Sequence, residues 1–191
     1  FYDLKTGQRT LDHTPMKLEK GDVLLIDSLH GLYPPMTESV PEEAKFRVYL
    51  EPLMQMKNEE GKYVRWTDIR LMRRMLRDAA YRAYDPKKTL THWHYVRSSE
   101  LRHIIPNNHY ADYIINSAMP YELALYADKL GHYFQDWVVE FKDDPLRVDA
   151  YQRAVRVNDL LRRINPVAED AAVPGDSVIR EFIGGGTLKL H

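Results

Sequence analysis

Four arginines are spaced so that a single helix face would carry all of them. Arg70, Arg73, Arg74 and Arg77 follow one another at intervals of three, one and three residues. In an α-helix, residues three, four and seven positions apart share a face. Like charges at these intervals repel, and a phosphate group, which accepts several hydrogen bonds from guanidinium groups, would offset that repulsion. We therefore interpret the segment as a phosphate-binding helix, with Arg82 little more than one turn beyond.

The alternative is a solvated charged face, which is what most runs of charge in helices are. Residues 65–102 hold ten Lys or Arg against four acidic residues, a surplus of six, whereas the whole chain has a net charge of −1. A basic balance along the whole chain would indicate nucleic acid. Because the charge is local, we expect a small phosphorylated ligand and no nucleic-acid partner.

The composition is that of a folded protein with one core. The chain has 191 residues, of which 44% are hydrophobic, and it contains no cysteine. The lack of cysteine excludes a disulfide framework, a thiolate zinc site and a cysteine nucleophile. No apolar run reaches the roughly 20 residues that a membrane span needs, and there is no signal-peptide pattern. We expect a soluble cytoplasmic protein.

Apolar runs and helical periodicity alternate along the first 119 residues. Residues 22–27, bounded by Gly21, have the profile of a strand buried in a parallel sheet, and residues 45–53 and 111–117 form two further predicted strands. Between them we predict the arginine helix from Thr67 or Asp68. The alternation indicates an α/β fold with a mostly parallel sheet.

After Pro120 the pattern becomes purely helical. Residues 121–141 and 143–164 predict two long helices that form an antiparallel pair, followed by a tail with three consecutive glycines at 184–186. We therefore divide the chain into residues 1–119, a core that includes a lid at about 64–105, and residues 120–191, a helical extension.

Asp27 lies at the carboxyl end of the strand predicted at residues 22–27. Ligands of parallel α/β sheets bind at the carboxyl ends of the strands. Magnesium prefers a few carboxylate oxygens together with water and substrate phosphates. Asp27 is therefore a candidate magnesium ligand, with a turn or helix-cap role as the alternative.

Several segments together resemble one known family. They are YDLKTGQR (2–9), DVLLIDSLHGL (22–32), RLMRRMLRDAAYR (70–82) and PNNHYADYIIN (106–116). In order and spacing they are similar to the uridine kinase and phosphoribulokinase family, which has the P-loop kinase fold. The resemblance is greatest to the larger bacterial uridine kinase-like nucleoside kinases, which end in a segment like SVIREFIGGG (177–186).

The resemblance implies transfer of the γ-phosphoryl group of ATP, with magnesium, to a hydroxyl group of a nucleoside. Arginines of a closing lid would stabilise the charge that develops on the transferred phosphoryl group. It also implies the following residue roles: substrate binding for Tyr2, Arg9 and Arg70, phosphate stabilisation by the lid for Arg73, Arg77 and Arg82, and magnesium binding for Asp27.

The chain departs from the family pattern in three places. Asp27-Ser28 stands where the family usually has Glu-Gly, and Gly7 stands where uridine and cytidine kinases commonly have histidine. The motif G-x-x-x-x-G-K-[ST], which cradles phosphates, does not occur, and GGGTLK at 184–189 has the wrong spacing. We expect this chain to be the C-terminal part of a kinase. The P-loop and the catalytic aspartate of that kinase would precede Phe1, and we expect the isolated part to be inactive.

Two other functions stay open. A noncatalytic phosphate- or nucleotide-binding regulatory module would keep the lid without catalysis. A metal-dependent hydrolase would use His92 and His94, although residues two apart on a helix face away from each other. The aromatic residues of 121–141 are interpreted as helix packing, with a subunit interface of a homo-oligomer as the alternative.

Overall fold

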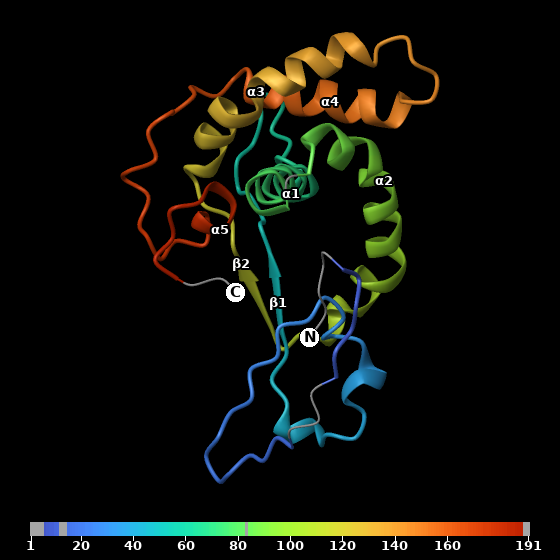
Figure 1. The fold of residues 1–191 in the computed structure, drawn as a ribbon, viewed down its shortest axis with the longest axis vertical. Helices are drawn as coiled ribbons and strands as arrows, with labels where there is room; N and C mark the ends of the chain where they lie inside the picture. Colours follow the sequence, from blue (N-terminus) through green and yellow to red (C-terminus); the bar gives the residue numbers. More distant parts are fainter. Residues whose placement is uncertain (1–5, 12–14, 83, 189–191) are drawn as a thin grey trace.

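The computed structural model describes residues 6–11, 15–82 and 84–188, except for the side chain of Arg82. Within these residues the chain forms two strands and five α-helices (Figure 1). They are β1 (Val48–Glu51), α1 (Trp66–Arg82), α2 (Pro86–His103), β2 (Tyr113–Asn116), α3 (Glu122–Glu140), α4 (Val148–Leu161) and α5 (Arg180–Ile183). Three short 3-10 helices cover Pro34–Thr37, Glu42–Ala44 and Ile105–Tyr110. The predicted α/β class is confirmed.

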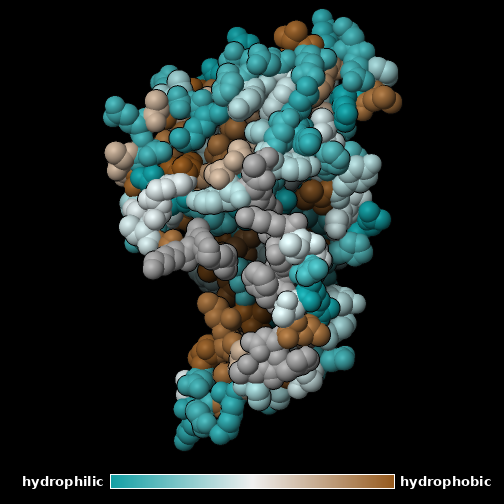
Figure 2. Space-filling view, in the orientation of Figure 1, coloured by the Kyte–Doolittle hydropathy of each residue, from teal (hydrophilic) through white to brown (hydrophobic). Residues whose placement is uncertain are grey.

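The two strands form a parallel sheet. Val48 lies opposite Tyr113 and Glu51 lies opposite Asn116, so both strands end at the same edge. Every residue of β2 is exposed, and Figure 2 shows apolar side chains gathered on the visible face at the level of the sheet. No described helix therefore covers the β2 side chains. The helices meet the sheet at the edge where both strands end.

The predicted strand at residues 22–27 is wrong. This segment has no regular structure, and Val23 and Leu25 are 90% and 91% exposed. An apolar run becomes a buried strand only where neighbouring strands complete its backbone hydrogen bonds and helices cover its faces. No described strand pairs with this segment, so Asp27 does not end a strand here.

Helix α1 passes through the centre of the core (Figure 1). Its side chains Ile69, Leu71, Met72 and Met75 are completely buried. It ends at Arg82, shortly before Asp85, whose carboxylate accepts a hydrogen bond from the backbone N–H of Lys87 at 2.8 Å and caps α2. None of the described helices combines the length and the apolar composition that a membrane span requires.

Helices α3 and α4 pack against each other and run in opposite directions, as predicted (Figure 1). Helix α4 is tied to α1 by Arg156, whose Nε and Nη2 each donate to the carboxylate of Asp68 at 2.7 Å. It is tied to α2 by Arg153, whose Nη1 donates to the carbonyl oxygen of Leu90 at 3.2 Å. The boundary between a core and a helical extension at residues 119 and 120 stays a prediction.

Gly131 lies in the middle of α3, where its flexibility is unfavourable. A Cβ added there would have no neighbouring atom within 4 Å. We expect Gly131→Ala to raise the free energy of unfolding by about 0.5–1 kcal/mol, because glycine loses more backbone freedom in a helix than alanine. Urea unfolding followed by circular dichroism measures the change. Gly184, with φ +82°, is the matched control: its alanine variant should lose stability, and a loss for Gly131→Ala as well would contradict this interpretation.

Candidate functional site

Arg73 of α1 lies beside Ser117, the residue that follows β2, and is held there by hydrogen bonds. Its Nε and Nη2 donate to the two carboxylate oxygens of Glu122 at 2.8 and 3.1 Å. Its Nη2 and Nη1 also donate to the carbonyl and hydroxyl oxygens of Ser117 at 2.7 and 3.1 Å. Only 6% of Arg73 is exposed, and Glu122 is fully buried. Burial disfavours the charged guanidinium, but the hydrogen bonds and charge of Glu122 outweigh it and raise the pKa of Arg73.

Arg70 lies at the end of the other strand. Its Nη2 is 2.6 Å from Glu100 Oε1, and its Nη1 is 3.5 Å from Oε1 of Glu51, the last residue of β1. Tyr49 donates its hydroxyl hydrogen to the same Glu51 oxygen at 2.6 Å. Burial is the main cause that raises the pKa of Glu51, and Oε2 of Glu51 is buried without a hydrogen-bond partner.

The ring of Trp66 contacts two arginines, Arg70 and Arg97, at the carboxyl end of β1. The guanidinium carbons of Arg70 and Arg97 lie 5.7 and 4.9 Å from its centroid, within the range of a cation–π interaction. Arg97 also forms an ion pair with Glu100. Two buried carboxylates, Glu51 and Glu100, are thus balanced by two arginines at the carboxyl end of β1.

Arg74 and Arg77 of α1 are more exposed than Arg70 and Arg73. Arg74 contacts Asp78, one turn further along the helix, at 2.6 Å, and 40% of its side chain is exposed. Arg77 Nη1 donates to Glu181 Oε1 in α5 at 3.0 Å, with about a third of each side chain exposed. The Nε of Arg77 is buried and has no hydrogen-bond partner. Arg77 therefore combines a partly exposed ion pair with a buried donor that has no partner.

The arginine face of α1 differs from both sequence-based interpretations. It is not a solvated face, because carboxylates from β1, α2, α3 and α5 cover it. It does not present free guanidinium groups either, since each arginine described on this face has an acidic partner. Binding of phosphate by these arginines stays a prediction, and it requires a phosphate to replace a carboxylate.

The other predicted site residues do not join this cluster. Arg9 and Asp27 are exposed, and among the described residues no hydrogen bond or ion pair joins either of them to an arginine of α1. The segment that contains Asp27 lies toward the amino end of β1, away from α1 (Figure 1). Tyr2 and the side chain of Arg82 lie outside the described residues. Of the predicted site residues whose side chains the structure describes, Arg70, Arg73 and Arg77 are brought together and Arg9 and Asp27 are not.

The two histidines of the alternative metal site lie on α2. His92 Nδ1 is 2.9 Å from the carbonyl oxygen of Lys88, and His94 Nδ1 is 3.9 Å from Asp149. Trp93 between them is buried in the core. Among the residues that the structure describes, no group of three or more His, Asp or Glu side chains could hold a metal ion.

The acidic partners of the arginines were missed in the sequence. They come from four separate segments, namely Glu51, Glu100, Glu122 and Glu181. A local signal existed for two of them: Glu51 ends a predicted strand before Pro52, and Glu122 follows Pro120 in the first turn of a predicted helix. Their pairing with particular arginines depends on tertiary packing.

Comparison with known proteins gives one match. A sequence model described as "Phosphoribulokinase / Uridine kinase family" matches residues 1–123. No curated protein and no solved structure matches the chain significantly. The matched residues include β1, β2 and the whole of the arginine helix α1.

Proposed function

The chain belongs to the phosphoribulokinase and uridine kinase family, and from this premise we propose that the full-length protein phosphorylates a nucleoside with ATP. This chain would supply the lid and part of the acceptor site. Family membership itself indicates a kinase with a small-molecule substrate. The nucleoside acceptor and the contribution of this part of the chain are the proposed elements.

One observation carries the proposal beyond family membership. Arg70 and Arg73 both lie where the parallel strands end, beside Glu51 of β1 and Ser117 after β2. Ligands of parallel α/β sheets bind at this edge. Arginines at this position are suited to phosphate because they stay charged and donate through a planar fork.

The α1 arginines differ in how readily they could reach a phosphate. Arg77 needs only to exchange a partly exposed partner, Glu181, and its Nε already lacks a hydrogen-bond acceptor. Arg82 lies little more than one turn further along the helix. Arg73 would have to leave a buried carboxylate, so we propose that Arg77 and Arg82 make the first contact with phosphate and that Arg73 follows only if Glu122 is displaced. Arg70 is proposed to face the acceptor.

ATP and magnesium are the proposed cofactors. Asp27 offers a hard carboxylate oxygen, and magnesium commonly takes one or two protein carboxylates while substrate phosphates and water complete its shell. Because the segment of Asp27 lies away from α1 in this structure (Figure 1), the role requires this segment to approach the phosphates that α1 would hold. Arg9 together with Tyr2 would contact the nucleoside. The proposed chemistry on the protein side is stabilisation of negative charge on the transferred phosphoryl group by arginines.

The proposal is tested by incubating the full-length protein with labelled ATP, magnesium and a panel of nucleosides. We expect a labelled nucleoside monophosphate, and Asp27→Asn should reduce its rate of formation by about tenfold or more, because the amide has no negative charge to offer the metal. Asp22→Asn, an exposed aspartate of the same segment, is the control and should leave the rate unchanged. Saturable ATP binding without any phosphorylated product would favour the noncatalytic module instead.

A further inference from the structure

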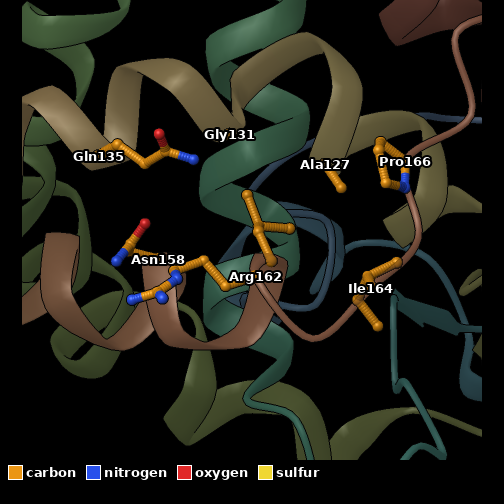
Figure 3. Close-up of a pocket in the computed structure, with 8 residues that line it drawn as sticks. Ala127, Gly131, Gln135, Asn158, Arg162, Ile164 and Pro166 are labelled. Carbon is orange, nitrogen blue, oxygen red and sulfur yellow. The ribbon is translucent and has the colours of Figure 1, made fainter.

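A cavity of about 250 Å³ lies between α3, α4 and the chain that follows α4. Figure 3 shows its two ends: Gln135, Asn158 and Arg162 gather at one, and Ala127, Ile164 and Pro166 line the other. It belongs to the helical part of the chain, beyond the residues 1–123 that match the family. Its volume is below the roughly 300 Å³ at which small-molecule sites in proteins usually begin, so only a small ligand would fit.

Asn158 provides the first sign of a ligand. Only 8% of this residue is exposed, yet its side chain forms no hydrogen bond with any other residue that the structure describes. Figure 3 shows the amide directed from α4 toward Gln135 on α3. Its oxygen and nitrogen are not among the buried side-chain atoms that lack a partner, so solvent in the cavity reaches the amide. An unpartnered amide directed into a cavity is therefore a position for a bound polar group.

Arg162 determines the charge of that group. Its side chain is exposed and has no ion pair within the described part of the chain, and no carboxylate lines the cavity. The adjacent Arg163, in contrast, contacts Glu59 at 3.5 Å and does not line the cavity. One guanidinium beside two amides balances a single negative charge. This composition suits a carboxylate better than a doubly charged phosphate.

The other end of the cavity is apolar. Ala127, Ile164 and Pro166 form its wall, and the missing side chain of Gly131 leaves space in α3, since a Cβ there would meet no atom within 4 Å. A flat hydrocarbon body fits this end because it would remove apolar surface from water on both sides.

We propose that this cavity binds a small carboxylate with an apolar or aromatic body. The carboxylate contacts Arg162 and the amides of Asn158 and Gln135, and the apolar body lies between Gly131 and Ile164. This site is separate from the arginine cluster of α1 and does not depend on the proposed kinase activity.

The proposal is tested by titrating the protein with naphthoate and, in parallel, with the uncharged naphthamide, while amide chemical shifts are recorded by NMR. We expect saturable shifts at residues of α3 and α4 with naphthoate and weaker binding of naphthamide. Arg162→Gln should weaken naphthoate binding about tenfold, the usual size of a hydrogen bond to a charged group. Arg163→Gln is the matched control and should bind as the wild type does.

Gly131→Leu supplies a second variant that does not alter any polar group. Its side chain would extend into the cavity, so naphthoate binding should be lost while the circular dichroism spectrum and the unfolding transition are retained. The proposal is overturned by any of three results: no saturable binding of naphthoate, equal binding of naphthoate and naphthamide, or equal weakening by Arg162→Gln and Arg163→Gln.

Discussion

Replacing Arg73 by alanine is expected to lower the free energy of unfolding by about 3–5 kcal/mol, the usual result of removing one partner of a buried ion pair. The substitution would leave the carboxylate of Glu122 fully buried with no cation, and it would remove the hydrogen bonds that join α1 to Ser117. Urea unfolding measures the loss. Arg102→Ala is the control, because Arg102 is exposed and, within the described residues, its side chain donates hydrogen bonds to Ser98 of its own helix and forms no ion pair.

A second substitution separates the buried charge from the lost hydrogen bonds. Glu122→Gln keeps an acceptor for the hydroxyl of Tyr126, which donates to Glu122 at 2.8 Å, but removes the negative charge. The double variant Arg73→Ala/Glu122→Gln should therefore be more stable than Arg73→Ala alone. If Arg73→Ala lost less than about 1 kcal/mol, Arg73 would be a freely moving lid residue and the buried pair would not hold α1 in place.

Replacing Arg70 by alanine is expected to produce a loss of stability that depends on pH. At about pH 7 we expect a loss of about 2–3 kcal/mol, slightly less than for a fully buried pair because about a quarter of the Arg70 side chain is exposed. The variant would leave the charges of Glu51 and Glu100 close together, with Arg97, which pairs with Glu100, as the cation that the described residues still place beside them. Removal of the Arg70 charge raises the pKa of Glu51 further.

The direction of the pH effect follows from this raised pKa. An acid whose pKa is higher in the folded than in the unfolded state contributes stability below its unfolded pKa of about 4.3 and loses it as the pH rises through the folded pKa. The deficit of Arg70→Ala should therefore shrink between about pH 7 and about pH 4.5. Adding Glu51→Gln should restore part of the stability at about pH 7. A deficit that is independent of pH, or that grows on acidification, would contradict the proposed burial of uncompensated acids.

The sequence was sufficient for the elements that depend on local patterns. Helix α1 is marked by arginines at helical spacing and by Thr67 or Asp68 as a cap, and α3 by apolar positions that recur every three or four residues. Strands β1 and β2 were also predicted. The strand predicted at residues 22–27 is absent from the structure. The apolar residues of this run indicate burial, but they do not show whether a neighbouring strand is present to pair with it.

Of the residues in the candidate site, the sequence predicted the arginines but not their acidic partners. The spacing of Arg70, Arg73 and Arg77 placed them on one helix face, which the structure shows. Their partners lie 49 residues away in the case of Glu122 and 104 residues away in the case of Glu181. Such pairs are set by how helices and strands pack, and periodicity within one segment contains no information about them.

The proposed phosphate role of α1 is tested most directly by the rate of nucleoside phosphorylation in Arg77→Ala. We expect kcat to fall about 100- to 1000-fold, the usual effect of removing one donor that stabilises transition-state charge. The free energy of unfolding should change by less than about 1 kcal/mol, because the pair of Arg77 with Glu181 is a third exposed. Arg102→Ala should leave both quantities unchanged. An unchanged kcat in Arg77→Ala would contradict the proposal that this helix stabilises the transferred phosphoryl group.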